Sequence, residues 1–128
     1  MPLTVPSLVP TEGTLFASAS RSATTRSASQ LNPGYKGIAI WFTPTVAGTG
    51  TLQLVLEAPD SLTGALPGIL TATAVSTTGT KYYLYYPGAV NTGATSAGGG
   101  VLPKFWDIVI VSSDGSAWTY SVSYCLLP

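Results

Sequence analysis

Residues 51–57 read TLQLVLE, and this stretch decides the fold class. Leu52, Leu54 and Leu56 alternate with polar residues such as Gln53. Side chains at every second position share one face of an extended strand, so the pattern predicts a β-strand with a buried and an exposed face.

The same alternation recurs on both sides of this stretch. Residues 37–43 (GIAIWFT) precede it, and residues 117–126 (AWTYSVSYCL) close the pattern near the end of the chain. Residues 104–112 (KFWDIVIVS) are apolar on both faces apart from Asp107, which is typical of a central strand covered on both sides. The remaining predicted strands are 14–20, 21–30 as an edge segment, 69–75 and 80–86.

Turn residues separate these segments and disfavour helices. The chain has 14 glycines and 10 prolines, and no window combines a 3.6-residue apolar period with helix caps. Pro44 is expected in a turn, and residues 87–100, which end in three glycines, are expected to be irregular. We therefore predict an all-β fold with little or no helix: an antiparallel β-sandwich of seven or eight short strands, with either jelly-roll or Ig-like topology.

The chain divides into two predicted parts. Residues 14–128 form a single β-sandwich domain, and residues 1–13 form a proline-rich extended arm, since proline removes backbone donors and favours extended geometry. The arm is either a frayed terminus or a segment that docks on a neighbouring subunit. Its candidate contact residues are Leu3, Val5, Leu8 and Val9.

Charge is scarce. Only 8% of residues are charged, against about 25% in a typical domain, and five basic residues balance five acidic ones. No basic stripe is available for nucleic-acid phosphates or for an anionic membrane, and no apolar run approaches the length of a membrane span. We expect neither nucleic acid nor membrane as a partner. Either the abundant serines and threonines keep the chain soluble, or partners cover much of its surface.

The residues that usually carry catalysis are few. The chain has no histidine and one cysteine, so nucleophile–histidine systems and zinc sites of cysteine and histidine are excluded. No phosphate-binding or calcium-loop motif is present. We therefore expect that the protein is not an enzyme and that it has no cofactor and no metal site.

The carboxylates are interpreted as structural. Glu57 and Asp60 are expected at a strand end and in a turn, where solvent surrounds them. Asp107 interrupts an apolar strand, and it either pairs with a cation, faces solvent at a sheet edge or blunts that edge against unwanted pairing. The cations considered for such a pair are Arg21, Arg26 and Lys36.

Aromatic residues are the remaining candidates for a binding surface. Four tyrosines lie within residues 82–86, so rings project from both faces of that predicted strand. One face can enter the core, and the other is covered by the chain itself or forms an exposed aromatic strip. Candidate partner contacts are Tyr83, Tyr85 and, by the same reasoning, Trp41.

Most of the chain past residue 13 resembles a family of small phage virion proteins. The resemblance lies in TLFASASRSATTRSAS (14–29), GYKGIAIWFTPTVAGTGTLQLVLEAPDSLTG (34–64) and VLPKFWDIVIVSSDGSAWTYSVSYCLL (101–127). The loop YYPGAVNTGAT (85–95) also fits the family, whereas the proline-rich lead and the very low charge depart from it.

This resemblance implies a structural β-sandwich protein that decorates or cements a phage capsid. The implied partners are the major capsid protein and further copies of the chain, as a homotrimer. The implied location is the outer surface of the virion, after synthesis in the host cytoplasm. The alternatives are another virion part, such as a head fibre, tail or receptor-binding domain, or a carbohydrate-binding module that uses Trp41, Trp106, Trp118 or residues 82–86.

Overall fold

The computed structural model describes residues 11–90 and 96–128. This part of the chain contains no helix, as predicted for the fold class, and ten β-strands rather than the predicted seven or eight. The strands are β1 (Glu12–Arg21), β2 (Thr25–Arg26), β3 (Gln30–Leu31), β4 (Gly37–Val46), β5 (Leu52–Glu57), β6 (Gly68–Thr71), β7 (Lys81–Tyr85), β8 (Ser96–Gly98), β9 (Phe105–Ser112) and β10 (Trp118–Leu127).

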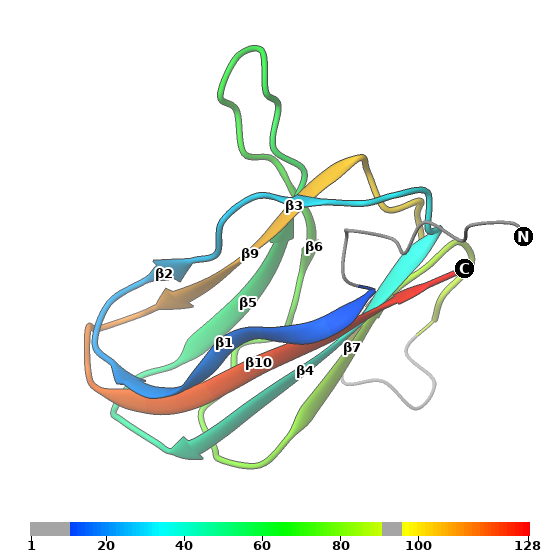
Figure 1. Cartoon of the computed structure of the whole chain (residues 1–128). Coiled ribbons are helices and arrows are strands. Elements are labelled where there is room, and N and C mark those ends of the chain that lie inside the picture. The colour runs from blue at the N-terminus through cyan, green and yellow to red at the C-terminus, as the bar shows by residue number, and fades with distance from the viewer. Residues whose placement is uncertain (1–10, 91–95) are drawn as a thin grey trace, which may run out of the picture.

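The strands form two packed sheets (Figure 1). The first, which we call sheet A, has the order β1-β10-β4-β7-β8. The second, sheet B, has the order β2-β9-β5-β6, and β3 also pairs with β9. All pairs are antiparallel except β7 with β8. The predicted β-sandwich is therefore confirmed.

The pairing order also decides between the two topologies that the sequence left open. Five antiparallel pairs are nested in the sequence: β1 with β10, β2 and β3 each with β9, β4 with β7, and β5 with β6. One long hairpin is thus wound around the core, with alternate pairs assigned to sheets A and B. This winding is a jelly roll.

The alternating residues fill the core as their spacing predicts. Leu52, Leu54 and Leu56 of β5 are all buried, and β10 alternates buried and half-buried positions over its whole length. Aromatic rings pack edge to face in the interior, both between neighbouring strands of sheet A, as Phe42 and Tyr120 do with ring centroids 5.4 Å apart, and between the sheets, as Trp106 and Tyr124 do at 5.1 Å. β9 is buried on both faces from Trp106 to Ile110, as its sequence indicates for a central strand.

Several strand boundaries differ from the predictions, and the largest shortening is in segment 69–75, where β6 ends at Thr71 and Val75 forms only an isolated bridge with Leu52. β1 begins at Glu12 rather than Thr14, so the last residues of the predicted arm already pair with β10. The edge segment 21–30 gives two short strands, β2 and β3. β4 continues past Pro44, because the register shifts there and the missing proline N–H is tolerated at the irregularity.

The region 87–100 was predicted to be irregular, but β8 lies within it. Its glycines permit close packing on Tyr85: a Cβ added to Gly98 would lie 2.9 Å from the Tyr85 ring. Consecutive glycines argued against a packed element here, but the missing side chain of Gly98 is what lets this strand approach Tyr85 of β7.

Candidate functional site: an aromatic sheet face and a buried carboxyl pair

An aromatic pair lies on the outer face of sheet A. Trp41 of β4 stands directly opposite Tyr82 of β7, and their ring centroids are 5.4 Å apart with the planes tilted by 39°. Trp41 is 36% exposed and Tyr82 is half-buried. The pair combines apolar rings with polar tips, as aromatic residues at protein interfaces do.

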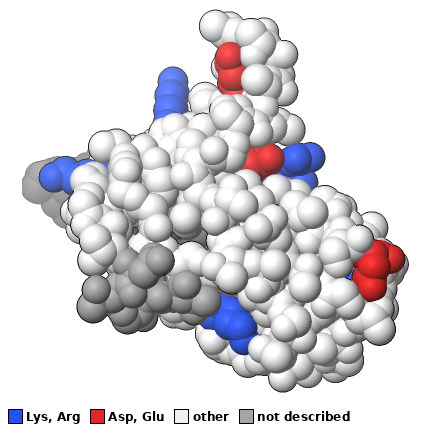
Figure 2. All heavy atoms as spheres, turned by 180° about the vertical axis from the view of Figure 1, so that it is seen from behind, with Lys and Arg blue, Asp and Glu red and all other residues white. Residues whose placement is uncertain are grey.

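The strands around this pair carry almost no charge. β4 and β10 contain no charged residue, and β7 contains only Lys81, whose ammonium group donates to the carbonyls of Thr78 and Gly79 in the preceding turn. The far side of the molecule also shows its charged groups as a few isolated spots in a neutral surface (Figure 2). The middle of the outer face of sheet A can therefore approach a neutral surface without leaving a charge desolvated, whereas Glu12 lies on the edge strand β1 of the same face, opposite Cys125. We call the outward-facing, partly exposed residues of its middle strands the Trp41 face: Trp41, Thr43, Tyr82, Leu84, Ser121, Ser123 and Cys125.

Two of the predicted partner contacts do not lie on this surface. Tyr83 is fully buried and Tyr85 nearly so, because the winding of the sheets turns this side of β7 into the core. Burial raises the pKa of Tyr83 to about 12. The prediction of Tyr83 and Tyr85 as contacts was wrong, and the outward rings of the segment are Tyr82 and Tyr86 instead.

The other sequence-based candidates have different outcomes. Trp41 is at the surface, as a contact residue must be. Trp106 and Trp118 are buried, so neither offers a ring on which a sugar could stack. The arm residues Leu3, Val5, Leu8 and Val9 lie outside the described residues.

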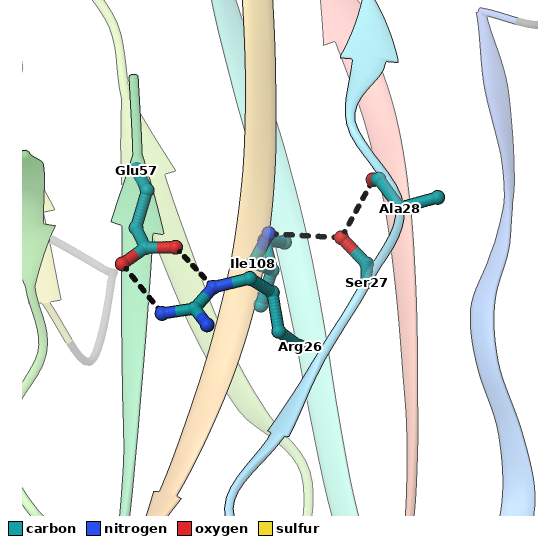
Figure 3. A network of polar contacts seen from close by, with 5 residues as sticks. All are labelled: Arg26, Ser27, Ala28, Glu57 and Ile108. Atoms are coloured by element: carbon teal, nitrogen blue, oxygen red, sulfur yellow. Dashed lines mark hydrogen bonds and ion pairs between the residues drawn. The ribbon is translucent and has the colours of Figure 1, made fainter. Parts of the chain in front are cut away.

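A cluster of charged side chains lies on the outer face of sheet B. Glu57 of β5 and Asp107 of β9 are direct cross-strand neighbours, and β2 brings Arg26 beside them. The Arg26 guanidinium donates two hydrogen bonds to the Glu57 carboxylate, at 2.8 Å to Oε1 and 3.2 Å to Oε2 (Figure 3). This fork joins a two-residue edge strand to the middle of the sheet.

Backbone contacts hold Arg26 in place. The amide of Ser27 donates to the Ile108 carbonyl at 2.9 Å, and the Ile108 amide donates to the Ser27 hydroxyl at 3.0 Å. The same hydroxyl donates to the carbonyl of Ala28 (Figure 3). Ser27 thereby secures the end of β2 to β9, and this fixes the position from which Arg26 reaches Glu57.

The two carboxyl groups have opposite pKa shifts. The pKa of Asp107 is raised to about 7, mainly by burial and also by a hydrogen bond with Glu57 and by the negative charge of Glu57, while the charge of Arg26 acts to lower it. Burial also acts to raise the pKa of Glu57, but hydrogen bonds from Arg26 and Asp107 outweigh it, so the net pKa is lowered. Below neutral pH the pair therefore holds one proton, on Asp107, which donates to the Glu57 carboxylate.

This geometry corrects the interpretation of Glu57 and decides between the roles considered for Asp107. Glu57 was expected to be solvated, but it is only 5% exposed. Asp107 is 3% exposed, which excludes the role that faces solvent, and of the three cations considered for it Arg26 acts on its pKa while forming its ion pair with Glu57. The Oδ1 atom of Asp107 has no hydrogen-bond partner among the described residues. Of Glu57 and Asp60, only Asp60 has the predicted solvent-exposed position in a turn.

Within residues 11–90 and 96–128 the surface forms no pocket, and no group of three or more potential metal ligands lies together. In the same part of the chain, no helix is long and apolar enough to cross a membrane. Comparisons of the chain with protein-family models, with characterised proteins and with solved structures found no significant match.

Proposed function

We propose that this chain is a structural virion protein that decorates or cements a phage capsid. In this proposal the Trp41 face binds the major capsid protein on the outer surface of the shell. The observation that carries the proposal is the exposed Trp41–Tyr82 pair in the middle of a sheet face whose strands are nearly free of charge. Interface centres are depleted of charge and enriched in aromatic residues.

Three further features support a lattice protein. Ten charged residues of balanced sign minimise repulsion between closely spaced copies, which a shell covered by homotrimers requires. Jelly rolls also recur in viral capsid proteins, although lectins share the fold, so this argument is by analogy. The resemblance of residues 14–29, 34–64 and 101–127 to small virion proteins points in the same direction.

The first test is the copy number of the chain in purified virions that carry its gene, by calibrated mass spectrometry beside the major capsid protein. We expect a simple fraction of the number of capsid subunits. A handful of copies per particle would assign the chain to a tail, vertex or fibre. Absence from the particle would overturn the proposal.

The second test concerns the Trp41 face. Trp41→Ala should weaken binding to shells that lack the chain by about 30-fold or more, the effect typical of a central aromatic contact. The matched control is Val101→Ala, since Val101 is also exposed but lies in the loop before β9. Co-sedimentation with shells measures both variants. Equal binding of Trp41→Ala and wild type to the shells would exclude this face as the contact. If the protein binds glycans instead of shells, and this binding depends on Trp41, a carbohydrate-binding module would be favoured.

A further inference from the structure

β1 (Glu12–Arg21) forms one edge of sheet A, and no described strand pairs with its outer side (Figure 1). It has ten residues, whereas the other strands at sheet edges, β2, β3, β6 and β8, have two to four. Ala17, Ser18, Ala19 and Ser20 are all exposed and uncharged. A long, neutral edge of small residues is open to strand pairing with another molecule, which proteins usually prevent with charges, prolines or bulges.

The pairing of β1 with β10 is irregular in the middle of the strand. The register shifts twice, between Thr14 and Phe16 and between Phe16 and Ala19. From Phe16 to Ala19 the chain advances three residues, while their partners Val122 and Tyr120 are two residues apart. β1 therefore carries an extra residue there, which is the arrangement of a β-bulge.

Arg21 binds both strands at this bulge. Its Nη1 atom donates to the Tyr120 carbonyl of β10 at 2.9 Å and to the Ala19 carbonyl at 3.3 Å, and its Nη2 atom donates to the Ala17 carbonyl at 2.7 Å. Carbonyls of both strands thus converge on one guanidinium group. The same group lies over the rings of Phe16 and Tyr120, 5.3 and 4.7 Å from their centroids, and these contacts fix its position.

Loss of the guanidinium would remove the donor that these carbonyls share. The carbonyls would regain backbone partners if β1 lost the bulge and paired regularly with β10. A bulge bends a strand and increases its twist, so its loss would leave β1 straighter and its outer side better suited to pairing. The contacts of Arg21 therefore determine whether this edge accepts another strand.

We propose that Arg21 prevents self-association: by holding the bulge in β1, it stops this strand from pairing with β1 of a second copy. The second copy is the partner because β1 is the one described edge strand longer than four residues, so a long strand pair between copies requires two β1 strands. General charge repulsion gives little protection, since the basic and acidic residues cancel. This role is independent of the proposed capsid function, which concerns the Trp41 face.

The first experiment removes the donors of Arg21 and keeps its stem. Arg21→Met should raise the self-association constant of the full chain by about tenfold or more, because a regular edge offers a row of main-chain hydrogen bonds. The matched control is Lys104→Met, which removes the same charge from an exposed cation over the ring of Phe105, outside the strands. Sedimentation over a series of concentrations measures both variants. Association of Arg21→Met equal to that of the wild type, or to that of Lys104→Met, would overturn the proposal.

The second experiment locates the contact. Ser18 is exposed in the irregular part of β1, and a lysine on an edge strand opposes pairing. Adding Ser18→Lys to Arg21→Met should restore the wild-type association constant, whereas Ser61→Lys, an exposed position outside the strands, should not. Hydrogen exchange of the amides of residues 13–20 should slow when Arg21→Met associates. Association that Ser18→Lys does not reduce, or slower exchange only outside β1, would exclude this strand as the contact.

Arg21→Lys decides the question if Arg21→Met does not fold. Lysine keeps the charge and a long stem but lacks the planar fork of donors that joins the two strands. Its self-association constant should also exceed the wild-type value. A wild-type value for Arg21→Lys, in the absence of a folded Arg21→Met, would overturn the proposal.

Discussion

The free energy of unfolding should fall by about 2 to 3 kcal/mol as the pH rises from 5 to 8, and Asp107→Asn should abolish most of this change. The chain has no histidine, the side chain that ordinarily titrates in this range. A pH dependence near neutrality therefore requires a displaced pKa, and Asp107, with a pKa raised to about 7, provides one.

The direction follows from proton binding in the two states. Between the ordinary aspartate pKa and about 7, the folded protein keeps a proton on Asp107 that the unfolded chain releases. This contribution to stability is complete below the ordinary pKa and disappears as the pH rises through about 7. Above that pH two adjacent buried carboxylates share the single charge of Arg26. Glu57 has a lowered pKa, so its contribution is lost only at acid pH.

Urea denaturation at a series of pH values measures this effect. Asparagine has the shape of a protonated aspartate and can donate to Glu57, so Asp107→Asn should match the wild type at pH 5 and exceed its stability at pH 8. Asp114→Asn is the control, because hydrogen bonds from Ser116 and Thr49 lower the pKa of Asp114 and keep it ionised throughout the range. A wild-type profile that is flat from pH 5 to 8, or an unchanged slope in Asp107→Asn, would contradict the assignment.

Trp118→Ala should destabilise the fold by about 3 to 5 kcal/mol, the range for truncating a buried aromatic residue. Trp118 is fully buried at the start of β10, and its indole N–H donates to the carbonyl of Thr49 at 3.3 Å. It thereby joins the β4–β5 turn to the last strand. Gly48 leaves room for the ring, since a Cβ there would lie 2.8 Å from Trp118 Cδ1.

Trp118→Phe separates the two contributions. It keeps most of the apolar volume and removes the N–H, so a loss of about 1 kcal/mol is expected for the hydrogen bond, with a further loss for the smaller ring. Trp41→Ala is the matched exposed tryptophan and should cost less than about 1 kcal/mol. The midpoints of urea denaturation give the comparison. Equal losses for Trp118→Ala and Trp41→Ala would show that Trp118 does not have this structural role.

The local pattern was sufficient to predict the long strands and, where apolar and polar residues alternate, the buried side of the strand. A two-residue period determines which side chains share a face, so Leu52, Leu54 and Leu56 could be assigned to the core without knowledge of their partners. The same period failed for residues 82–86, because both faces of that strand carry rings. Only the winding of the jelly roll decided that Tyr83 enters the core and Tyr82 faces out.

The sites depended on register between distant strands. Trp41 meets Tyr82, and Glu57 meets Asp107, only because β4 pairs with β7 and β5 with β9 at particular offsets. A shift by one residue would turn each of these side chains to the opposite face of its sheet. The sequence by itself determined an all-β, charge-poor chain with alternating strands, because alternation and composition are local properties. Which tyrosines are exposed and which carboxyl groups meet was decided by the tertiary structure, because pairing joins residues far apart in the chain.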